Sequence, residues 1–247
     1  MMSPEDQESV STIRSEGIGI VRGVLTGDDL AATRLDFDRA HQDLEKGPGQ
    51  PGVRDRLTGS HLLEYPAIAD LYSHPRIMDI VCEMLTDSIP WVWQIITNRY
   101  SPEHPGVGKH SDGFKGELSS PFSRQSMAVF LDDIDEESGS LTYVPGSHLR
   151  HFISRDDPER QAPTQTDIEK GEYITTKLKA GDVVFRVPEV WHAVRPIHHL
   201  RRYVTASYVA RERLSAVMTE RLGRELKTRL AIPLDQVPER LQPYWVW

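Results

Sequence analysis

The pattern of hydrophobic and polar residues changes near residue 90. Before it, residues 17–25 alternate apolar with small or polar side chains, which predicts a strand. Residues 26–47 and 73–86 repeat apolar side chains at helical spacing, which predicts two helices. The N-terminal third is therefore expected to be mainly helical, with one early strand.

Residues of ordinary capping type mark the ends of these two predicted helices. The first is expected to begin at Thr26 or Asp28 and to end before Gly47, and the second has Ser73 as its candidate cap. The spacing predicts one apolar face on the first helix, formed by Leu30, Leu35 and Phe37.

From residue 91 the chain consists of short apolar runs separated by Gly, Pro, Asp and Ser. Repeated short strands with such turn signals indicate a β-sandwich or barrel. We therefore expect one domain over 1–247, with helical support over 1–90, a β core over 91–210 and a C-terminal helix over 211–247. The runs are WVWQIITNRY, SMAVFLDDI, SLTYVP, YITTKL, DVVFRV and RYVTASYVA.

Charge and composition narrow the class of protein. The 247 residues carry a net charge of −8, which argues against general nucleic-acid binding. The single cysteine, Cys82, excludes an internal disulfide framework and a cysteine-rich zinc site. The acidic N-terminus lacks the apolar segment of a signal peptide, and no apolar run has the length of a membrane span. We expect a cytoplasmic protein with a small-molecule partner and no nucleic-acid or membrane partner.

The stretch GKHSDGF places His110 and Asp112 two residues apart. Gly, Ser and Asp are common in surface turns, so an ordinary polar turn is one interpretation. The other is a metal site, because residues i and i+2 of a strand point to the same face. Two histidines and one carboxylate form the facial triad of non-haem Fe(II) oxygenases. The metal interpretation therefore requires a second histidine on a neighbouring strand.

His192 is the best candidate for that second histidine. It follows an apolar run in VPEVWHAVRP, 80 residues after Asp112, and that gap holds enough short strands to pass around a small barrel and return. The competing histidines lie in turn-like or polar segments without an apolar flank; they are His104, His148, His198 and His199.

Five segments, in order, resemble the phytanoyl-CoA dioxygenase-like (PhyH) family of Fe(II)/2-oxoglutarate-dependent oxygenases. They are GIGIVRGVLTGDDL, HSD, FLDDIDEESGSLTYVPGSH, KAGDVVFRVPEVWHAV and LRRYVTASY. The resemblance implies a mainly β double-stranded β-helix (a jelly-roll, cupin-like barrel) with flanking helices. It also implies Fe(II) held by the catalytic residues His110, Asp112 and His192, with 2-oxoglutarate and O₂ as cosubstrates. The expected enzyme is a dioxygenase that hydroxylates a small molecule and releases succinate and CO₂.

The same resemblance implies an arginine for the distal carboxylate of 2-oxoglutarate. Its planar fork suits a bidentate bond to a carboxylate. Arg201 and Arg202 are both candidates, and strand alternation allows only one to face inward. We favour Arg201, because Val204 and Thr205 follow it as in the family pattern.

Similarity to the ectoine-hydroxylase subgroup adds Gln94, Asn98 and Ser126 as candidate 2-oxoglutarate contacts, although the aromatic segment that follows the His-X-Asp motif in that subgroup is absent here.

The intact Asp112 favours hydroxylation over halogenation. Alternatives are desaturation, epoxidation or ring formation at the same site, a cupin-type metal enzyme that does not use 2-oxoglutarate, or a non-catalytic binding module. The substrate is not identified; basic residues near the His-X-Asp motif suit an anion, and these are Lys109, Lys115 and Arg124.

Overall fold

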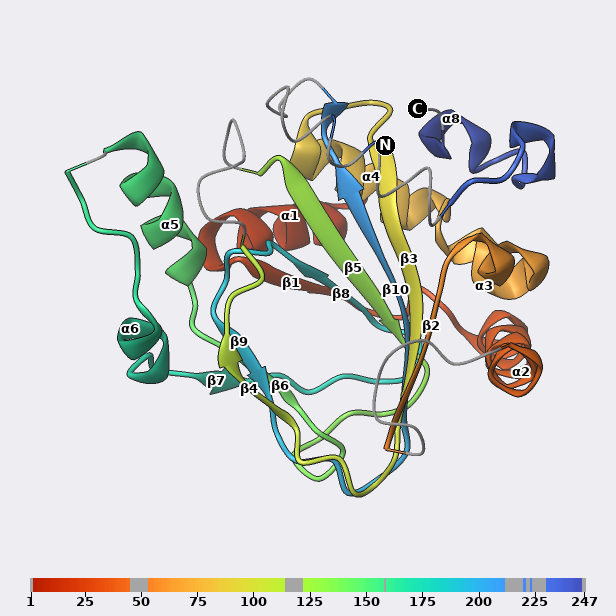
Figure 1. The fold of residues 1–247 in the computed structure, drawn as a ribbon, viewed down its shortest axis with the longest axis horizontal. Helices are drawn as coiled ribbons and strands as arrows, with labels where there is room; N and C mark the ends of the chain where they lie inside the picture. The colour runs from red at the N-terminus through yellow and green to blue at the C-terminus, as the bar shows by residue number, and fades with distance from the viewer. Residues whose placement is uncertain are drawn as a thin grey trace.

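A computed structural model describes residues 2–44, 53–113, 122–157, 159–211, 220, 223 and 230–245. Two antiparallel sheets lie face to face, with helices outside them (Figure 1). The large sheet has six strands in the order β1-β8-β5-β10-β3-β2, and the small sheet has four in the order β4-β9-β6-β7. This is the predicted jelly-roll arrangement, but among the described residues no strand pairing joins the two sheets into a closed barrel.

The elements follow one another along the chain as α1 (Pro4–Glu16), β1 (Ile18–Val21), α2 (Gly27–Asp43), β2 (Arg54–Thr58), η1 (Ser60–Glu64), α3 (Pro66–Leu71), α4 (Pro75–Leu85), β3 (Trp91–Tyr100), β4 (Val107–His110), β5 (Arg124–Phe130), β6 (Leu141–Tyr143), α5 (Ser147–Asp156), α6 (Gln165–Glu169), β7 (Ile174–Thr175), β8 (Val183–Arg186), β9 (His192–Val194), β10 (Arg201–Val209), η3 (Leu234–Gln236) and α8 (Gln242–Trp245). The described helices include none with the length and apolar character needed to cross a lipid bilayer.

Alternation along β10 separates the hydrophobic core from the interior between the sheets. Val204, Ala206 and Tyr208 are fully buried in the core on the outer face of the large sheet. Tyr203 and Thr205 instead line a cavity on the inner face. A side-chain period of two in a strand produces this division.

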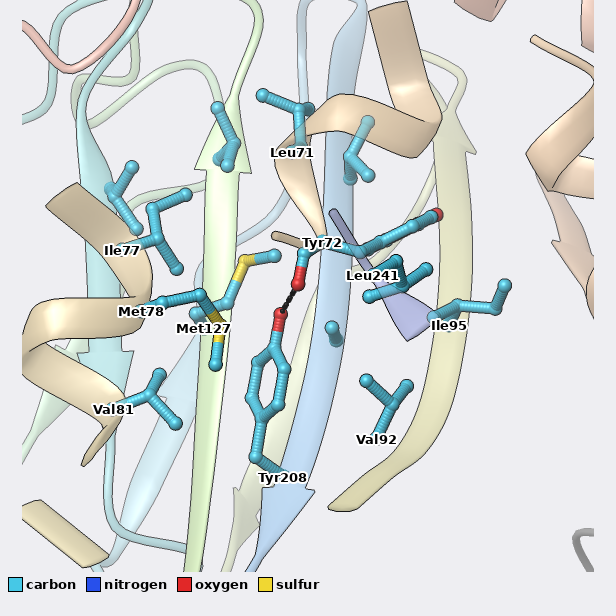
Figure 2. Close-up of a cluster of buried hydrophobic side chains, with 14 of the residues drawn as sticks. Leu71, Tyr72, Ile77, Met78, Val81, Val92, Ile95, Met127, Tyr208 and Leu241 are labelled. Carbon is cyan, nitrogen blue, oxygen red and sulfur yellow. Dashed lines mark hydrogen bonds between the residues drawn. The ribbon is translucent and has the colours of Figure 1, made fainter. Parts of the chain in front are cut away.

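Helix α4 covers the outer face of the large sheet. Its buried residues Ile77, Met78 and Val81 pack near Met127 and Tyr208, as Figure 2 shows. The buried Tyr208 hydroxyl donates a 2.7 Å hydrogen bond to the Tyr72 carbonyl, which satisfies both polar atoms inside the core. This packing holds β5 and β10 in place from outside and leaves their inner faces for the site.

Several details differ from the sequence predictions. Leu35 was expected on the apolar face of α2 but is 62% exposed, because the helix buries Phe37 and Ala40 instead. The residue that caps α4 is His74 rather than Ser73, and its side chain makes no cap hydrogen bond. Most of the predicted C-terminal helix lies outside the described residues.

Candidate active site

His110 and His192 are direct partners across the antiparallel pair β4–β9 of the small sheet. Their ring centroids are 4.1 Å apart. Strand β9 lies between β4 and β6 in the small sheet, so the chain comes back beside β4 at His192. The two histidines are 82 positions apart in the sequence and lie side by side in the sheet, as a shared site requires.

Backbone carbonyl groups orient both imidazole rings. His110 Nδ1 lies 2.7 Å from the Gly108 carbonyl oxygen, and His192 Nδ1 lies 3.0 Å from that of Val190. Since a carbonyl can only accept, each Nδ1 carries the proton and each Nε2 keeps its lone pair. Both Nε2 atoms face Asp112, at 3.4 Å from His110 and 3.8 Å from His192.

Asp112 is held by groups from the large-sheet side. Its backbone N–H donates to the Pro188 carbonyl, and its Oδ2 accepts a 2.6 Å hydrogen bond from Arg186 Nη2. Burial opposes its ionisation, but the Arg186 charge and the bond with His110 outweigh burial and hold the pKa of Asp112 below its usual value. Burial also lowers the pKa of His192, so this ring is neutral, the form that binds metals.

These three residues fit a metal ion. One nitrogen or oxygen from each lies within 4.8 Å of the others, and no other group of this kind occurs in the part of the chain that the structure describes. Two ligands bound about 2.1 Å from an octahedral ion would be roughly 3 Å apart, so small side-chain movements suffice. Two imidazoles and one carboxylate suit Fe(II) with open positions.

The predicted ligands border a cavity of about 490 Å³ between the two sheets. Seven of the eight predicted site residues line it, namely Gln94, Asn98, His110, Asp112, Ser126, His192 and Arg201. The eighth, Arg202, does not. The structure thus brings the predicted residues around one interior space, while their roles in binding stay predictions.

Arg201 lies at the start of β10 and is only 3% exposed. Its guanidinium lies among aromatic rings, with centroids at 5.5 Å for Tyr100, 5.3 Å for Phe130 and 5.1 Å for Tyr203. Burial lowers the pKa of Arg201. Among the described residues no carboxylate forms an ion pair with Arg201, and its Nε atom has no hydrogen-bond partner. A buried cation without a counter-ion is costly, so the site suits an anionic ligand.

Arg202 faces the opposite side of the strand. Its guanidinium bonds Asp132 at 2.8 Å and Asp38 at 2.9 Å, which ties β10 to α2. These carboxylates already satisfy its charge. Of the two candidate arginines, only Arg201 is therefore available to a ligand in the cavity.

Ser126 and Asn98 lie on strands next to β10. The Ser126 hydroxyl is 3.0 Å from that of Ser207, and Asn98 Oδ1 accepts a 3.2 Å bond from Arg54 Nη2. Gln94 also lines the cavity, four residues before Asn98 on β3. These polar side chains can therefore donate or accept hydrogen bonds inside the cavity.

Sequence reasoning missed three further arginines of the cavity wall, and Arg124 was noted only as a nearby cation. Arg54 and Arg56 come from β2, a strand not predicted because it is short and charged, although their two-residue spacing was a usable signal. Arg186 ends β8, inside a segment already assigned to a strand. Arg124 donates to the Asp112 carbonyl at 2.8 Å and stacks on Trp93, and burial lowers its pKa to about 10.

Trp191 directly precedes His192 in the chain. It is 1% exposed and donates from Nε1 to His151 Nε2 at 2.8 Å, under helix α5. It does not line the cavity and is a core aromatic residue.

Comparison with solved structures supports the fold. The non-heme alpha-ketoglutarate-dependent epimerase SnoN from nogalamycin biosynthesis matches with a TM-score of 0.68 and 22% identity, over 83% of this chain and 82% of that one. The carbocyclase SnoK from the same biosynthesis matches with a TM-score of 0.68 and 20% identity, over 84% of each chain. HygX from Streptomyces hygroscopicus, solved with nickel and 2-oxoglutarate, matches with a TM-score of 0.63 and 18% identity, over 83% of this chain and 87% of that one.

No curated protein sequence matches the chain significantly. The family profile described as phytanoyl-CoA dioxygenase (PhyH) matches residues 13–198, which include β1, all three candidate metal ligands and most of both sheets. The chain therefore belongs to the phytanoyl-CoA dioxygenase (PhyH) family of non-haem Fe(II)/2-oxoglutarate-dependent enzymes.

Proposed function

We propose that this protein hydroxylates a small molecule, with Fe(II) bound by His110, Asp112 and His192. The observation that carries the proposal is the convergence of two imidazole Nε2 atoms and one carboxylate at an interior cavity. When bound there, iron and 2-oxoglutarate supply the activation of O₂, with release of succinate and CO₂.

The protein residues orient and shield these groups. Arg201 would bind the distal carboxylate of 2-oxoglutarate at the buried end of the cavity, next to Arg54 and Asn98. Ser126 and Gln94 would contribute hydrogen bonds from neighbouring strands. The aromatic rings around Arg201 exclude water, which strengthens a charge-assisted bond.

A substrate fits beside these groups in a cavity of this size. HygX has been solved with hygromycin B and SnoN with nogalamycin RO, so folds of this kind accept natural products of moderate size. We infer a specialised metabolite as the substrate class.

The same three metal ligands are compatible with reactions other than hydroxylation. SnoN is an epimerase and SnoK a carbocyclase on the same fold, so stereochemical inversion or ring formation is the second candidate. Mass spectrometry separates these outcomes. Hydroxylation adds one oxygen atom, epimerisation leaves the formula unchanged, and ring formation or desaturation removes two hydrogens.

The test of the proposal is Fe(II)-dependent conversion of 2-oxoglutarate to succinate, measured together with bound metal. His110→Ala, Asp112→Ala and His192→Ala should each lose most Fe(II) binding and turnover, because each removes one of three protein ligands. His198→Ala, outside the cavity, is the matched control. Full metal content and turnover in any triad variant would remove that residue from the ligand set.

A further inference from the structure

Arg186 makes the shortest polar contact to the proposed metal ligands, and the function proposed above assigns it no role. Its Nη2 donates to Asp112 Oδ2 at 2.6 Å, and its side chain is 19% exposed. The residue is fixed at the end of β8, where its backbone lies between Ser126 of β5 and Ile18 of β1. The guanidinium therefore approaches Asp112 from a rigid position on the large sheet.

The contact with Asp112 is specific to one oxygen of the carboxylate. Arg186 Nη1 also lies 3.3 Å from His192 Nδ1, but that nitrogen already donates to the Val190 carbonyl and cannot accept a second donor. Asp112 Oδ1 is turned toward His110 Nε2, at 3.4 Å. Arg186 thus holds Oδ2, which also lies 3.8 Å from His192 Nε2, while Oδ1 faces His110 and accepts no hydrogen bond from the arginine.

This division would matter for an octahedral ion. The three protein ligands would occupy three positions, and the remaining three would be needed by 2-oxoglutarate and O₂. A carboxylate that bound through both oxygens would take one position more and would compete with a cosubstrate. A charge-assisted bond from a planar guanidinium on a rigid strand is well suited to prevent this.

We propose that Arg186 is a positioning residue that keeps Asp112 a one-oxygen metal ligand and so preserves the positions needed by the cosubstrates. The inference rests on the proposed function, since it needs the metal and 2-oxoglutarate to bind at this site. Nearby Arg124 does not duplicate this role, because it bonds the backbone carbonyl of Asp112 rather than the carboxylate.

The test uses Mn(II), which loads the site without turnover. Calorimetry would give the Mn(II) affinity and then the 2-oxoglutarate affinity of the loaded protein, for wild type, Arg186→Ala and Arg186→Lys. Arg195→Ala, at an exposed surface pair with Glu136, is the matched control. Crystal structures of the Mn(II)-loaded wild type and Arg186→Ala would show how many Asp112 oxygens bind the ion.

In Arg186→Ala we expect Mn(II) to bind at least as tightly as in wild type, because a repelling cation is gone and a second oxygen is free. The affinity for 2-oxoglutarate should fall about tenfold, and both Asp112 oxygens should bind the ion. Arg186→Lys should recover part of the 2-oxoglutarate affinity. If Arg186→Ala does not fold, Arg186→Met, which fills the space without a hydrogen-bond donor, carries the same expectation.

Wild-type 2-oxoglutarate affinity and one-oxygen coordination in Arg186→Ala would overturn the inference and leave the proposed function intact. Loss of both Mn(II) and 2-oxoglutarate binding in the wild type itself would instead overturn the proposed function. The two failures are therefore distinguishable.

Discussion

At the scale of single residues, the neighbouring arginines Arg201 and Arg202 give the sharpest prediction. Removing a buried cation that pairs with a ligand carboxylate costs about 3–5 kcal/mol. At about 1.4 kcal/mol per tenfold, Arg201→Ala should weaken 2-oxoglutarate binding by two orders of magnitude or more. The measurement is the 2-oxoglutarate concentration dependence of succinate formation.

Arg202→Ala is the control for Arg201→Ala, because Arg202 faces away and pairs with Asp132 and Asp38. It should leave the 2-oxoglutarate dependence nearly unchanged but lower the stability of the fold, because two carboxylates lose their partner. A large effect from Arg202 alone would assign the cosubstrate to the other face of β10. No effect from either variant would place the anchor elsewhere and count against 2-oxoglutarate.

Arg54 gives a second prediction at the same scale. It lies beside Arg201 around the Tyr100 ring, at 5.3 Å from that ring's centroid, and bonds Asn98. Arg54→Ala should lower the affinity for 2-oxoglutarate about tenfold, the effect of one charge-assisted hydrogen bond.

The control for Arg54 is a change of ligand. 2-Oxovalerate lacks the distal carboxylate, so its binding should be the same in wild type and Arg54→Ala. An equal loss for both ligands would show that Arg54 acts on the shape of the cavity and not on the carboxylate.

The sequence was informative about residues where the chemistry is local. His110 and Asp112 both line the cavity as expected, although β4 ends at His110 and Asp112 follows the strand; alternation along β10 places Arg201 and Arg202 on opposite faces. Arg186 and Arg54 could not be placed on the cavity wall in this way, because their positions depend on which strands pair across the sheet. Pairing is a long-range property that periodicity does not contain.

At the scale of elements, ion pairs join α1 to α4, and the pair with the most buried carboxylate is that of Asp6 with Arg76. Asp6 accepts hydrogen bonds from Arg76 Nε at 3.0 Å and Nη2 at 2.8 Å. The bonds with Arg76 hold the pKa of Asp6 below its usual value despite burial. A lowered carboxyl pKa in the folded state means that the pair stabilises the protein above the unfolded pKa of about 3.9 and loses this as pH falls.

We therefore predict that Asp6→Asn lowers the free energy of unfolding by about 1.5–3 kcal/mol at neutral pH. The difference from wild type should shrink as the pH falls below about 4, because the wild-type carboxyl is then protonated as well. Urea unfolding at several pH values measures this. Glu8→Gln, an exposed carboxyl on the same helix, is the control. A difference that does not change with pH would assign the effect to packing.

Prediction of the elements themselves was uneven for a physical reason. The strand β3 and the helix α4 have long, regular apolar patterns and were predicted closely. Helix α1 has a weak pattern, since polar Asp6 and Ser9 are among its few buried residues, and it was missed. The turn-like PGSH segment leads into α5, where Gly146 adopts a positive φ of 71° just before the helix.

At the scale of the whole molecule, the proposed ligands would join the two sheets. His110 and His192 belong to the small sheet, while Arg201 and Arg186 belong to the large one. A metal ion with bound 2-oxoglutarate would thus contact both sheets across an interior that strand pairing does not close. Its binding should stabilise the fold as a unit and not only the site.

Ligand binding should accordingly raise the melting temperature in two separable steps. A ligand at 100 times its dissociation constant adds about 2.7 kcal/mol, and 1 kcal/mol shifts a domain of this size by roughly 2–4 °C. Ni(II) and then 2-oxoglutarate should each raise the melting temperature of chelator-treated protein by about 5–11 °C. Arg201→Ala should keep the first step and lose most of the second, whereas His192→Ala should lose both. Equal melting temperatures for chelated and loaded wild-type protein would contradict a ligand that joins the sheets.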